Sequence, residues 1–381
     1  MPNSSDRGDL HSDSPLDTVD DDKLGYSNFA VHLADTIATR VPTDGFVIGI
    51  YGQWGSGKST ILEFVGEEIA EIEENERPIV VRYNPWWFSG QADLFEIFFD
   101  ELAIALGEDS DLSDIRDEIH KYSKTLSNLP LDLAGIPMSP LRTLTKLTEE
   151  EETSIHEIKD DISETLAGSE RPIVVMIDDM DRLTQREVSQ MFQLVKSVAD
   201  FPNLTYILAF DEDVIVKALE AEEGLENGQE YLEKIIQLPV RIPVPEENSF
   251  AELVETQLRD ILGDQHIDEN RFQVLLQNGV LPTLATPRDA TRLANAVDFN
   301  FSAIRDEANF VDLVALESLR VFYQDVYEEI RDNSERFVGR QPRTTHQRNQ
   351  DKDDYVDILP DSEDDHKREI VISILSVLFR K

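Results

Sequence analysis

The sequence predicts an α/β protein with a five-stranded parallel sheet in a three-layer arrangement, followed by a C-terminal helical domain. Three observations lead to this prediction. Apolar runs of strand length alternate with helical patterns up to Pro245, helical patterns alone follow from Ser249 to Asp332, and a glycine-rich loop joins the first strand to the next helix. Strands that alternate with helices form a parallel sheet covered on both faces, because each crossover helix packs back onto the sheet.

The predicted strands are short apolar runs bounded by polar or turn-forming residues. They are Phe46–Tyr51, Ile79–Tyr83, Ile173–Ile177, Leu204–Phe210 and the end of Tyr231–Ile242. The helices expected between them are Leu24–Arg40, the segment from the glycine loop to about Glu74, Asp93–Leu106, Glu149–Leu166, Thr184–Ala199 and Asp213–Glu220. The third strand is apolar at every position, which is typical of a strand buried on both faces.

Composition along the chain predicts four parts. Residues 1–22 form a disordered acidic tail, because they are polar and poor in large apolar groups. Residues 23–245 form the α/β domain, with 107–170 as a helical and loop insertion, and residues 246–332 form the helical domain. Residues 333–381 are a mobile linker that ends in the amphipathic stretch Ile370–Leu378. Leu126–Leu144 is weakly apolar, but Asp132 and three prolines exclude a membrane helix there.

The charge of the chain limits its partners. Asp and Glu number 78 against 35 Lys and Arg, a net charge of −43. A broad nucleic-acid surface or docking on anionic lipid needs surplus positive charge, so neither is expected. Acid spread over the whole surface is typical of proteins from salt-loving organisms. The chain has no cysteine, and its first residues lack the apolar core of a signal peptide. We expect a cytoplasmic protein from a high-salt cell interior, without an integral membrane segment.

The glycine-rich loop after the first strand has the sequence G-Q-W-G-S-G-K-S-T and predicts phosphate binding. Its residues are Gly52, Gln53, Trp54, Gly55, Ser56, Gly57, Lys58, Ser59 and Thr60. Glycines let such a loop fold back and point its N–H groups at phosphate oxygens, and the following helix adds the positive end of its dipole. Lys58 is expected to reach the β- and γ-phosphates of a nucleotide, and Ser59 to offer its hydroxyl to Mg²⁺.

A second candidate group follows the strand Ile173–Ile177. Asp178, Asp179 and Asp181 come directly after it, at the edge where the carboxyl ends of parallel strands meet. Asp178 is the expected carboxylate on the metal side. Asp179, on the other side of the strand end, is expected to orient or deprotonate the attacking water, and Asp181 is a second candidate for that role.

Three further polar residues have two interpretations each. Asp211, at the end of the strand Leu204–Phe210, either senses the γ-phosphate or the metal through water, or caps the next helix. Lys234 and Gln237 precede the fifth strand, where Lys234 forms either a structural ion pair or a nucleotide contact.

Arg288 and Arg292 lie four residues apart on the helix that begins after Thr286, with Pro287 at its first position. One hypothesis is that one of them reaches the γ-phosphate from the helical domain, in the same subunit or a neighbour, and stabilises the transition-state charge. The alternative is a salt bridge to the many acidic residues.

Aromatic residues gather in two places. Trp86, Trp87 and Phe88 follow the second strand, and packing in the core between the sheet edge and a helix is the favoured interpretation, with a partner surface as the alternative. The segment from Tyr26 to Phe29 precedes the first strand and is a candidate neighbour of the adenine ring.

Several motifs in this order resemble the KAP family of P-loop NTPases. They are the glycine loop with Trp54, N-P-W-W after the second strand, I-D-D-M-D-R-L, I-L-A-F-D-E-D-V-I, Y-L-E-K-I-I-Q-L-P and P-R-D-A-T-R-L-A-N, and the resemblance covers about Asp22 to Ile330. It implies a Mg²⁺-dependent, ATP-preferring nucleoside triphosphatase of the additional-strand type, in which another strand separates the strand before Gly52 from the strand before Asp178. It also implies that Lys58 and Ser59 bind phosphate and metal and that Asp178 holds Mg²⁺, with looser roles for Arg288 and Arg292.

These observations predict a slow ATP hydrolase that acts as a conformational switch, with ATP and Mg²⁺ as cofactors and a protein partner or self-association as its output. Family members have been linked to phage exclusion and to signalling scaffolds, and for this chain both are analogies. Two alternatives remain: a module that holds nucleotide without turnover and responds by assembly, and a small-molecule kinase. The kinase would need a basic lid, whereas residues 107–170 are acidic.

Overall fold

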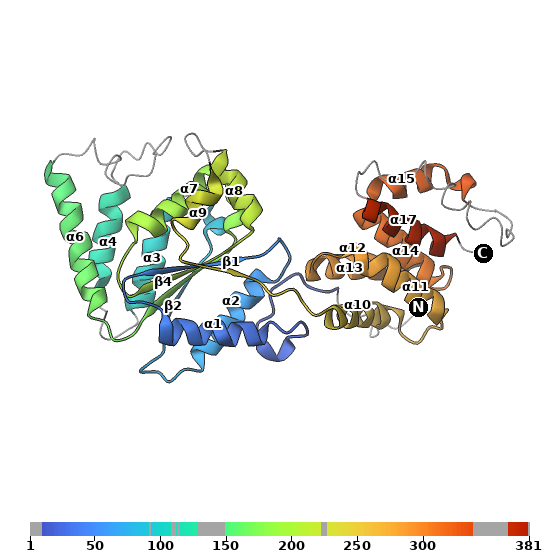
Figure 1. Cartoon of the computed structure of the whole chain (residues 1–381), viewed down its shortest axis with the longest axis horizontal. Coiled ribbons are helices and arrows are strands. Elements are labelled where there is room, and N and C mark those ends of the chain that lie inside the picture. The colour runs from blue at the N-terminus through green and yellow to red at the C-terminus, as the bar shows by residue number, and fades with distance from the viewer. Residues whose placement is uncertain are drawn as a thin grey trace. The chain divides into compact units, whose positions relative to one another are not determined.

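The computed structural model describes residues 10–90, 93–107, 112, 115–127, 149–221, 227–337 and 365–379. The chain divides into two compact units. Residues 15–244 form an α/β unit, and residues 1–14 together with 245–381 form a helical unit. Figure 1 shows the sheet of the first unit and the helices of the second.

The α/β unit is built on a five-stranded parallel sheet with the order β2-β3-β4-β1-β5. The strands are β1 (Phe46–Tyr51), β2 (Ile79–Tyr83), β3 (Ile173–Ile177), β4 (Leu204–Phe210) and β5 (Leu238–Arg241). The first four have the predicted bounds, because each is an apolar run with polar or turn residues at both ends. Since β4 lies between β1 and β3, the predicted additional-strand arrangement is confirmed.

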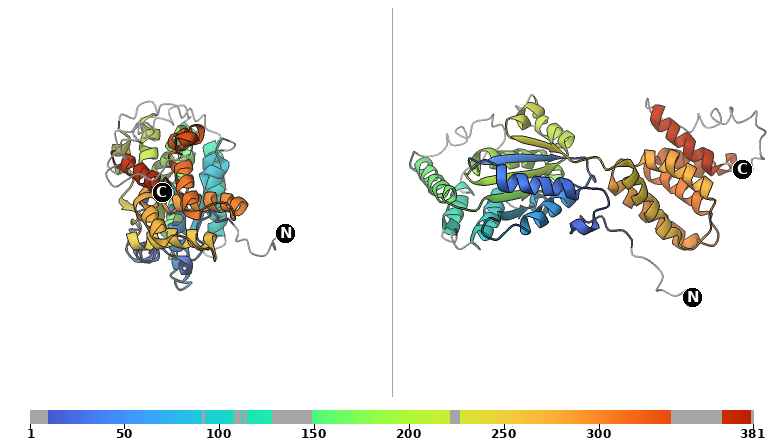
Figure 2. Two further views of the ribbon diagram at one scale, coloured as in Figure 1. Left: turned by 90° about the vertical axis from the view of Figure 1, so that its right-hand side faces the viewer. Right: turned by 60° about the horizontal axis from the view of Figure 1, so that its bottom comes forward.

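Helices cover both faces of this sheet, so the predicted three layers are confirmed (Figure 2). The helices are α1 (Ser27–Arg40), α2 (Lys58–Ala70), α3 (Leu94–Gly107), α4 (Ile115–Ser127), α6 (Glu149–Ala167), α7 (Gln185–Gln193), α8 (Glu212–Glu220) and α9 (Gly228–Glu233). Short helical turns lie at Pro85–Phe88 and Met180–Arg182, and a π-helical segment at Leu194–Val198.

Alternation along the strands separates the two cores. Ile48 and Ile50 of β1 pack with α1 and α2 on one face, whereas Val47 and Tyr51 belong to the core on the other face, with α3, α4, α6, α7 and α8. Successive side chains of a strand point to opposite faces, so one apolar run supplies both layers. The sheet edge with the carboxyl ends of the strands is thereby held between two packed layers.

The helical unit has its own apolar core. Its helices are α10 (Glu247–Leu262), α11 (Glu269–Leu275), α12 (Leu281–Thr283), α13 (Pro287–Ile304), α14 (Phe310–Phe322), α15 (Gln324–Asp332) and α17 (Asp365–Leu378), with a π-helical segment at Leu276–Val280. The predicted start of α13 is confirmed: Thr286 is its cap and exchanges hydrogen bonds with Asp289, and Pro287 is the first helical residue. In the part of the chain that the structure describes, no helix is both long enough and apolar enough to cross a membrane.

The composition predicted a disordered tail over residues 1–22. The structure describes residues 10–22 of this segment, and several of them form hydrogen bonds. In the helical unit, His11 donates its N–H to Asn295 at 2.8 Å. In the α/β unit, the N–H of Val19 donates to Glu67 at 2.8 Å, and Asp22 accepts hydrogen bonds near the start of α1. Most of Leu126–Leu144 and much of the predicted linker after residue 333 lie outside the described residues.

Two phenylalanines on α13 offer a matched test of the core of the helical unit. Phe301 is fully buried and packs against Phe310 with ring centroids 4.9 Å apart, whereas Phe299 is 70% exposed. We expect Phe301→Ala to lower the free energy of unfolding of this unit by about 3–5 kcal/mol. Phe299→Ala should change it by less than about 0.5 kcal/mol. Urea unfolding followed by circular dichroism measures both, and equal effects would contradict this packing.

Candidate functional site

The loop between β1 and α2 takes a shape that requires glycine. Gly55 and Gly57 have positive φ angles of 86° and 95°. A Cβ atom added to Gly57 would lie 2.8 Å from the ring of Tyr26, and one added to Gly52 would lie 2.4 Å from the Ser56 hydroxyl. The backbone conformation and the close neighbours of these residues therefore require glycine. The loop ends at Lys58, where α2 begins.

Tyr26, the residue before α1, packs against this loop. Its hydroxyl donates to the carbonyl oxygen of Ser56 at 3.0 Å, and its ring contacts Gly57. Burial, and secondarily the negative charge of Asp22, raises the pKa of Tyr26 to about 12, so the phenol stays protonated as a donor. The sequence placed Tyr26 among candidate neighbours of an adenine ring; its contact with the loop depends on tertiary packing.

Lys58 is the central cation of the site. Its Nζ donates to the carbonyl oxygens of Gly52 at 3.0 Å and Gln53 at 3.3 Å, and lies 3.1 Å from Oδ2 of Asp181. The side chains of Lys58 and Asp181 are only 7% and 5% exposed. The ammonium group thus ties the glycine loop to the turn after β3, so the structure brings together the two motifs that the sequence placed at one sheet edge.

Asp178 and Ser59 lie close enough to share a ligand. Burial raises the pKa of Asp178, while a hydrogen bond from the Ser59 hydroxyl and the positive charge of Lys58 act in the opposite direction. A buried carboxylate pays a desolvation cost in its charged form, and a cation beside it offsets that cost. Among the described residues, no group of three or more His, Cys, Asp or Glu side chains could hold a metal alone. The pair fits Mg²⁺, which takes one or two protein ligands together with water and phosphate.

The Asp179 carboxylate is held by two side chains that the sequence analysis did not single out. Asn84, after β2, donates its amide to Oδ2 of Asp179 at 2.8 Å, and Nε of Arg182 lies 2.9 Å from Oδ1. The backbone of Asp179 has a positive φ of 56°, unusual for a residue with a side chain, and its N–H donates to Asp178 at 2.8 Å. Asp178 and Asp179 are consecutive but stand in different surroundings.

One polar atom of the loop lacks a hydrogen-bond partner among the residues that the structure describes. The hydroxyl oxygen of Ser56 is buried and makes no hydrogen bond to any described residue. A buried polar atom without a partner costs roughly 1–3 kcal/mol. Such an atom in a glycine cradle, next to a buried lysine, suits a ligand with oxygen atoms.

The tryptophans of the site are exposed. The favoured interpretation as core residues is wrong for Trp86 and Trp87, which are 44% and 72% exposed, whereas Phe88 is partly buried and packs against the core. Trp54 in the glycine loop is 60% exposed. Trp86 instead stacks against the guanidinium of Arg182, whose Cζ lies 4.7 Å from the centroid of the Trp86 ring, and Arg182 in turn contacts Asp179. Apolar character alone predicted burial, whereas a tryptophan can also sit at a polar surface.

The remaining candidates have local structural partners. Asp211 caps α8 by accepting the N–H of Asp213 at 3.1 Å, and its own N–H donates to Asp181 at 3.1 Å. Lys234 forms an ion pair with Glu230 at 2.7 Å, which is the structural alternative. Gln237 accepts the N–H of Val47 at 2.7 Å and thereby ties the start of β5 to β1.

Arg288 and Arg292 belong to the helical unit. Arg288 forms an ion pair with Asp13, and Arg292 lies 3.4 Å from Asp289 and over the ring of Phe322. Both are thus engaged with acidic residues of their own unit, and their contact with a γ-phosphate stays a prediction.

A substitution at Gly57 tests whether the cradle shape is needed for binding. Gly57 and Gly90 both have positive φ, but only at Gly57 would a Cβ meet another atom, the ring of Tyr26 at 2.8 Å. Both alanine variants should lose about 1 kcal/mol to backbone strain. The sequence predicts nucleotide binding at this loop, and Gly57→Ala alone should then weaken binding of a fluorescent ATP analogue by about tenfold or more, because the Tyr26 ring must move. Equal affinities of the two variants, measured by titration, would contradict this.

Comparison with known proteins identifies relatives of the chain. The Phage T7 exclusion protein of Escherichia coli (strain K12) is 27% identical in an alignment of 350 residues, which covers 83% of this chain and 47% of that protein. The chain thus spans about half the length of this curated relative. Among solved structures, Cdc6p from Pyrobaculum aerophilum has a TM-score of 0.41 at 12% identity, covering 78% of this chain and 68% of that one. A mutant of RuvB from Thermotoga maritima has a TM-score of 0.37 at 12% identity, covering 86% and 83%. The sequence model of the KAP family P-loop domain matches residues 26–302, and the chain therefore belongs to the KAP family of P-loop NTPases.

Proposed function

We propose that this protein binds ATP with Mg²⁺ at the edge of the sheet and hydrolyses it slowly, as a conformational switch. The observation that carries the proposal is the buried ammonium of Lys58, which joins the glycine loop to the end of β3 beside Ser59 and Asp178. Membership of a P-loop NTPase family supports nucleotide binding at this loop.

Each of these side chains has a distinct proposed role. The backbone of the loop and Lys58 would bind the phosphates, with the Ser56 hydroxyl satisfied there. Ser59 and Asp178 would hold Mg²⁺, and a bound Mg²⁺ neutralises charge on the phosphate oxygens. Trp54, exposed in the loop, would lie beside the bound nucleotide.

Asp179 is the proposed general base. A carboxylate oxygen of Asp179 would accept a proton from the attacking water, while Asn84 and Arg182 keep the side chain in one orientation. Asp181, the second candidate, has its carboxylate directed at Lys58 and at the N–H of Asp211. We therefore propose that Asp181 positions Lys58 and does not act on water.

The switch would act through the two units. The chain passes from the α/β unit to the helical unit at Val244 and Pro245. In the proposal, ATP draws the helical unit toward the sheet edge, where Arg288 or Arg292 of the same or a neighbouring chain stabilises charge on the γ-phosphate, and hydrolysis releases it. A protein partner or a second copy would respond to this change. The name of the curated relative supports a role in phage exclusion.

Two alternatives remain open to test. A binding module without turnover would show the same nucleotide affinity and ATP-dependent light scattering, but no phosphate release. A small-molecule kinase would transfer phosphate to a metabolite and not to water. No observation on the described residues favours the kinase.

Phosphate release from Mg·ATP in high salt tests the proposal. We expect Lys58→Ala to reduce it by at least about a hundredfold, because the cation that meets the transferred phosphate is lost. Lys217→Ala on α8, outside the site, removes the same charge and should leave the rate unchanged. Equal rates for wild type and Lys58→Ala, or no ATP binding by either, would refute the proposal.

Separate variants distinguish the two aspartates. We expect Asp179→Asn to lower kcat by about 10²–10⁴-fold with little change in ATP affinity, because a base is lost. Asp181→Asn should destabilise the nucleotide-free protein by about 3 kcal/mol, because a buried ion pair is broken. Its ATP-induced rise in Tm should then exceed that of wild type, since phosphate restores a partner to Lys58. A large fall in kcat for Asp181→Asn with unchanged Tm would reassign the base to Asp181.

A further inference from the structure

In the described part of the chain, β2 is the terminal strand of the sheet and pairs with β3 alone. The N–H of Ile79 donates to Pro172 at 2.8 Å, and the carbonyl of Tyr83 accepts from Asp178 at 3.3 Å, so these residues face β3. Along a parallel strand the N–H and C=O groups of alternate residues point to opposite sides. Those of Val80 and Arg82 therefore point outward, where no strand of the described chain pairs with them.

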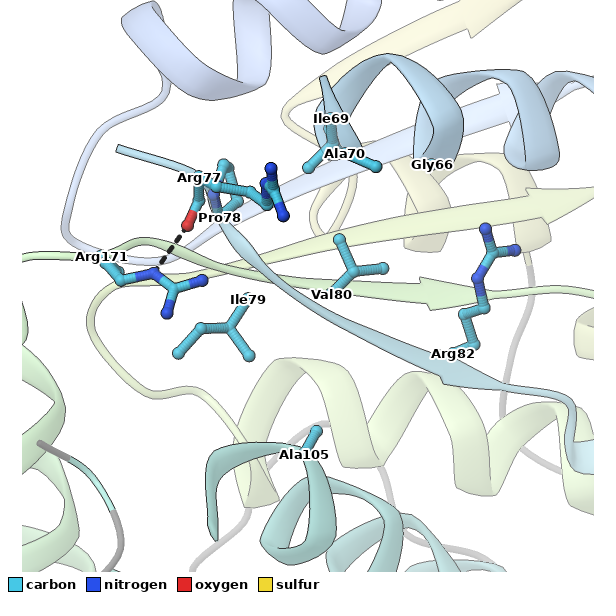
Figure 3. Close-up of a pocket in the computed structure, with 10 residues that line it drawn as sticks. All are labelled: Gly66, Ile69, Ala70, Arg77, Pro78, Ile79, Val80, Arg82, Ala105 and Arg171. Atoms are coloured by element: carbon cyan, nitrogen blue, oxygen red, sulfur yellow. Dashed lines mark hydrogen bonds between the residues drawn. The ribbon is translucent and has the colours of Figure 1, made fainter. Parts of the chain in front are cut away.

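A groove of about 440 Å³ runs beside this edge. Figure 3 shows it around the β2 residue Val80, with Ile69 of α2 on one face of the sheet and Ala105 of α3 on the other. The groove thus lies beside the unpaired backbone and is lined by apolar side chains as well as arginines. An open edge strand of this kind is a template for an additional strand.

Three arginines line the groove, although the whole chain carries a net charge of −43. Nε of Arg171 donates to the carbonyl of Arg77 at 2.8 Å, and Nε of Arg77 donates to Ile72 at 3.0 Å. Arg82 pairs with Glu63 at 2.7 Å. In Figure 3, Arg77 and Arg171 stand at one end of the groove and Arg82 at the other. Backbone contacts hold two of these guanidinium groups in place, so the positive charge of the groove is preorganised.

We propose that this groove binds an acidic peptide in an extended conformation, as a sixth strand added to β2. The peptide backbone would pair with Val80 and Arg82, and its alternate carboxylates would meet the arginines. β2 is about 17 Å long at about 3.3 Å per residue, which suits a segment of about five residues. Pairing with the same edge of a second copy would bring six arginines together, so charge favours an acidic partner. A nucleic acid would leave the backbone groups of Val80 and Arg82 unpaired.

Fluorescence anisotropy in 0.5 M salt with a labelled ten-residue peptide of alternating Glu and Val tests the proposal. We expect saturable binding, about tenfold or more weaker for the double variant Arg77→Glu and Arg171→Glu. Arg186→Glu on α7, outside the groove, should bind as wild type does. A peptide with proline at alternate positions should also bind at least about tenfold more weakly, because it lacks backbone donors.

Hydrogen exchange on the wild type provides a readout that does not depend on the folding of a variant. Bound peptide should slow exchange of the Val80 and Arg82 amides. The proposal is overturned if the Glu–Val peptide does not bind, in which case the arginines only protect the edge from aggregation. It is also overturned if exchange at these amides is unchanged, if the proline peptide binds equally, or if a single-stranded oligonucleotide of equal charge binds more tightly.

Discussion

The buried ammonium of Lys58 is the interaction on which the site depends. A cation that is only 7% exposed pays a large desolvation cost unless charged and polar partners surround it. Here two carbonyl oxygens from the loop and one carboxylate from the turn after β3 supply those partners. These partners come from different segments of the chain. Their contacts with the ammonium group therefore offset its desolvation cost and also fix the loop relative to the turn after β3. The same contacts of Lys58 therefore set the geometry of the loop and compensate the buried positive charge.

The turn after β3 shows how two adjacent carboxylates acquire different properties. Asp178 is buried against Ser59, and its burial raises its pKa, whereas the left-handed backbone at Asp179 turns the second carboxylate toward Asn84 and Arg182. A left-handed conformation costs a residue with a side chain roughly 1–2 kcal/mol. The hydrogen bond and the ion pair at Asp179 offset this cost. Arg182 also stacks on the exposed Trp86, so consecutive contacts connect this surface to the carboxylate of Asp179.

Local signals predicted most of the fold and part of the site. Four strands have their predicted bounds, because turn residues at both ends of a continuous apolar run define where the strand begins and ends. The glycine loop and Asp178 could be proposed as site residues from the sequence because their motifs are formed by neighbouring residues of the chain. The contacts of Tyr26, Asn84 and Arg182 were not predicted, since each joins segments whose register is set only when the sheet forms. Trp86 and Trp87 were assigned to the core because apolar character does not reveal which side of a turn faces solvent.

Concentrated salt acts differently on the two kinds of ion pair in this chain. At 1 M salt, screening extends over about 3 Å in solvent, which removes the mutual repulsion of a surface with net charge −43 and weakens exposed pairs such as Lys234–Glu230. The Lys58–Asp181 pair is shielded from ions by the loop and the core around it. Salt should therefore relieve the repulsion of the acidic surface without loosening the site. The geometry around Lys58 depends on buried contacts. The protein can therefore carry a strongly negative surface without weakening this site, whereas a site held by exposed ion pairs would be weakened by screening.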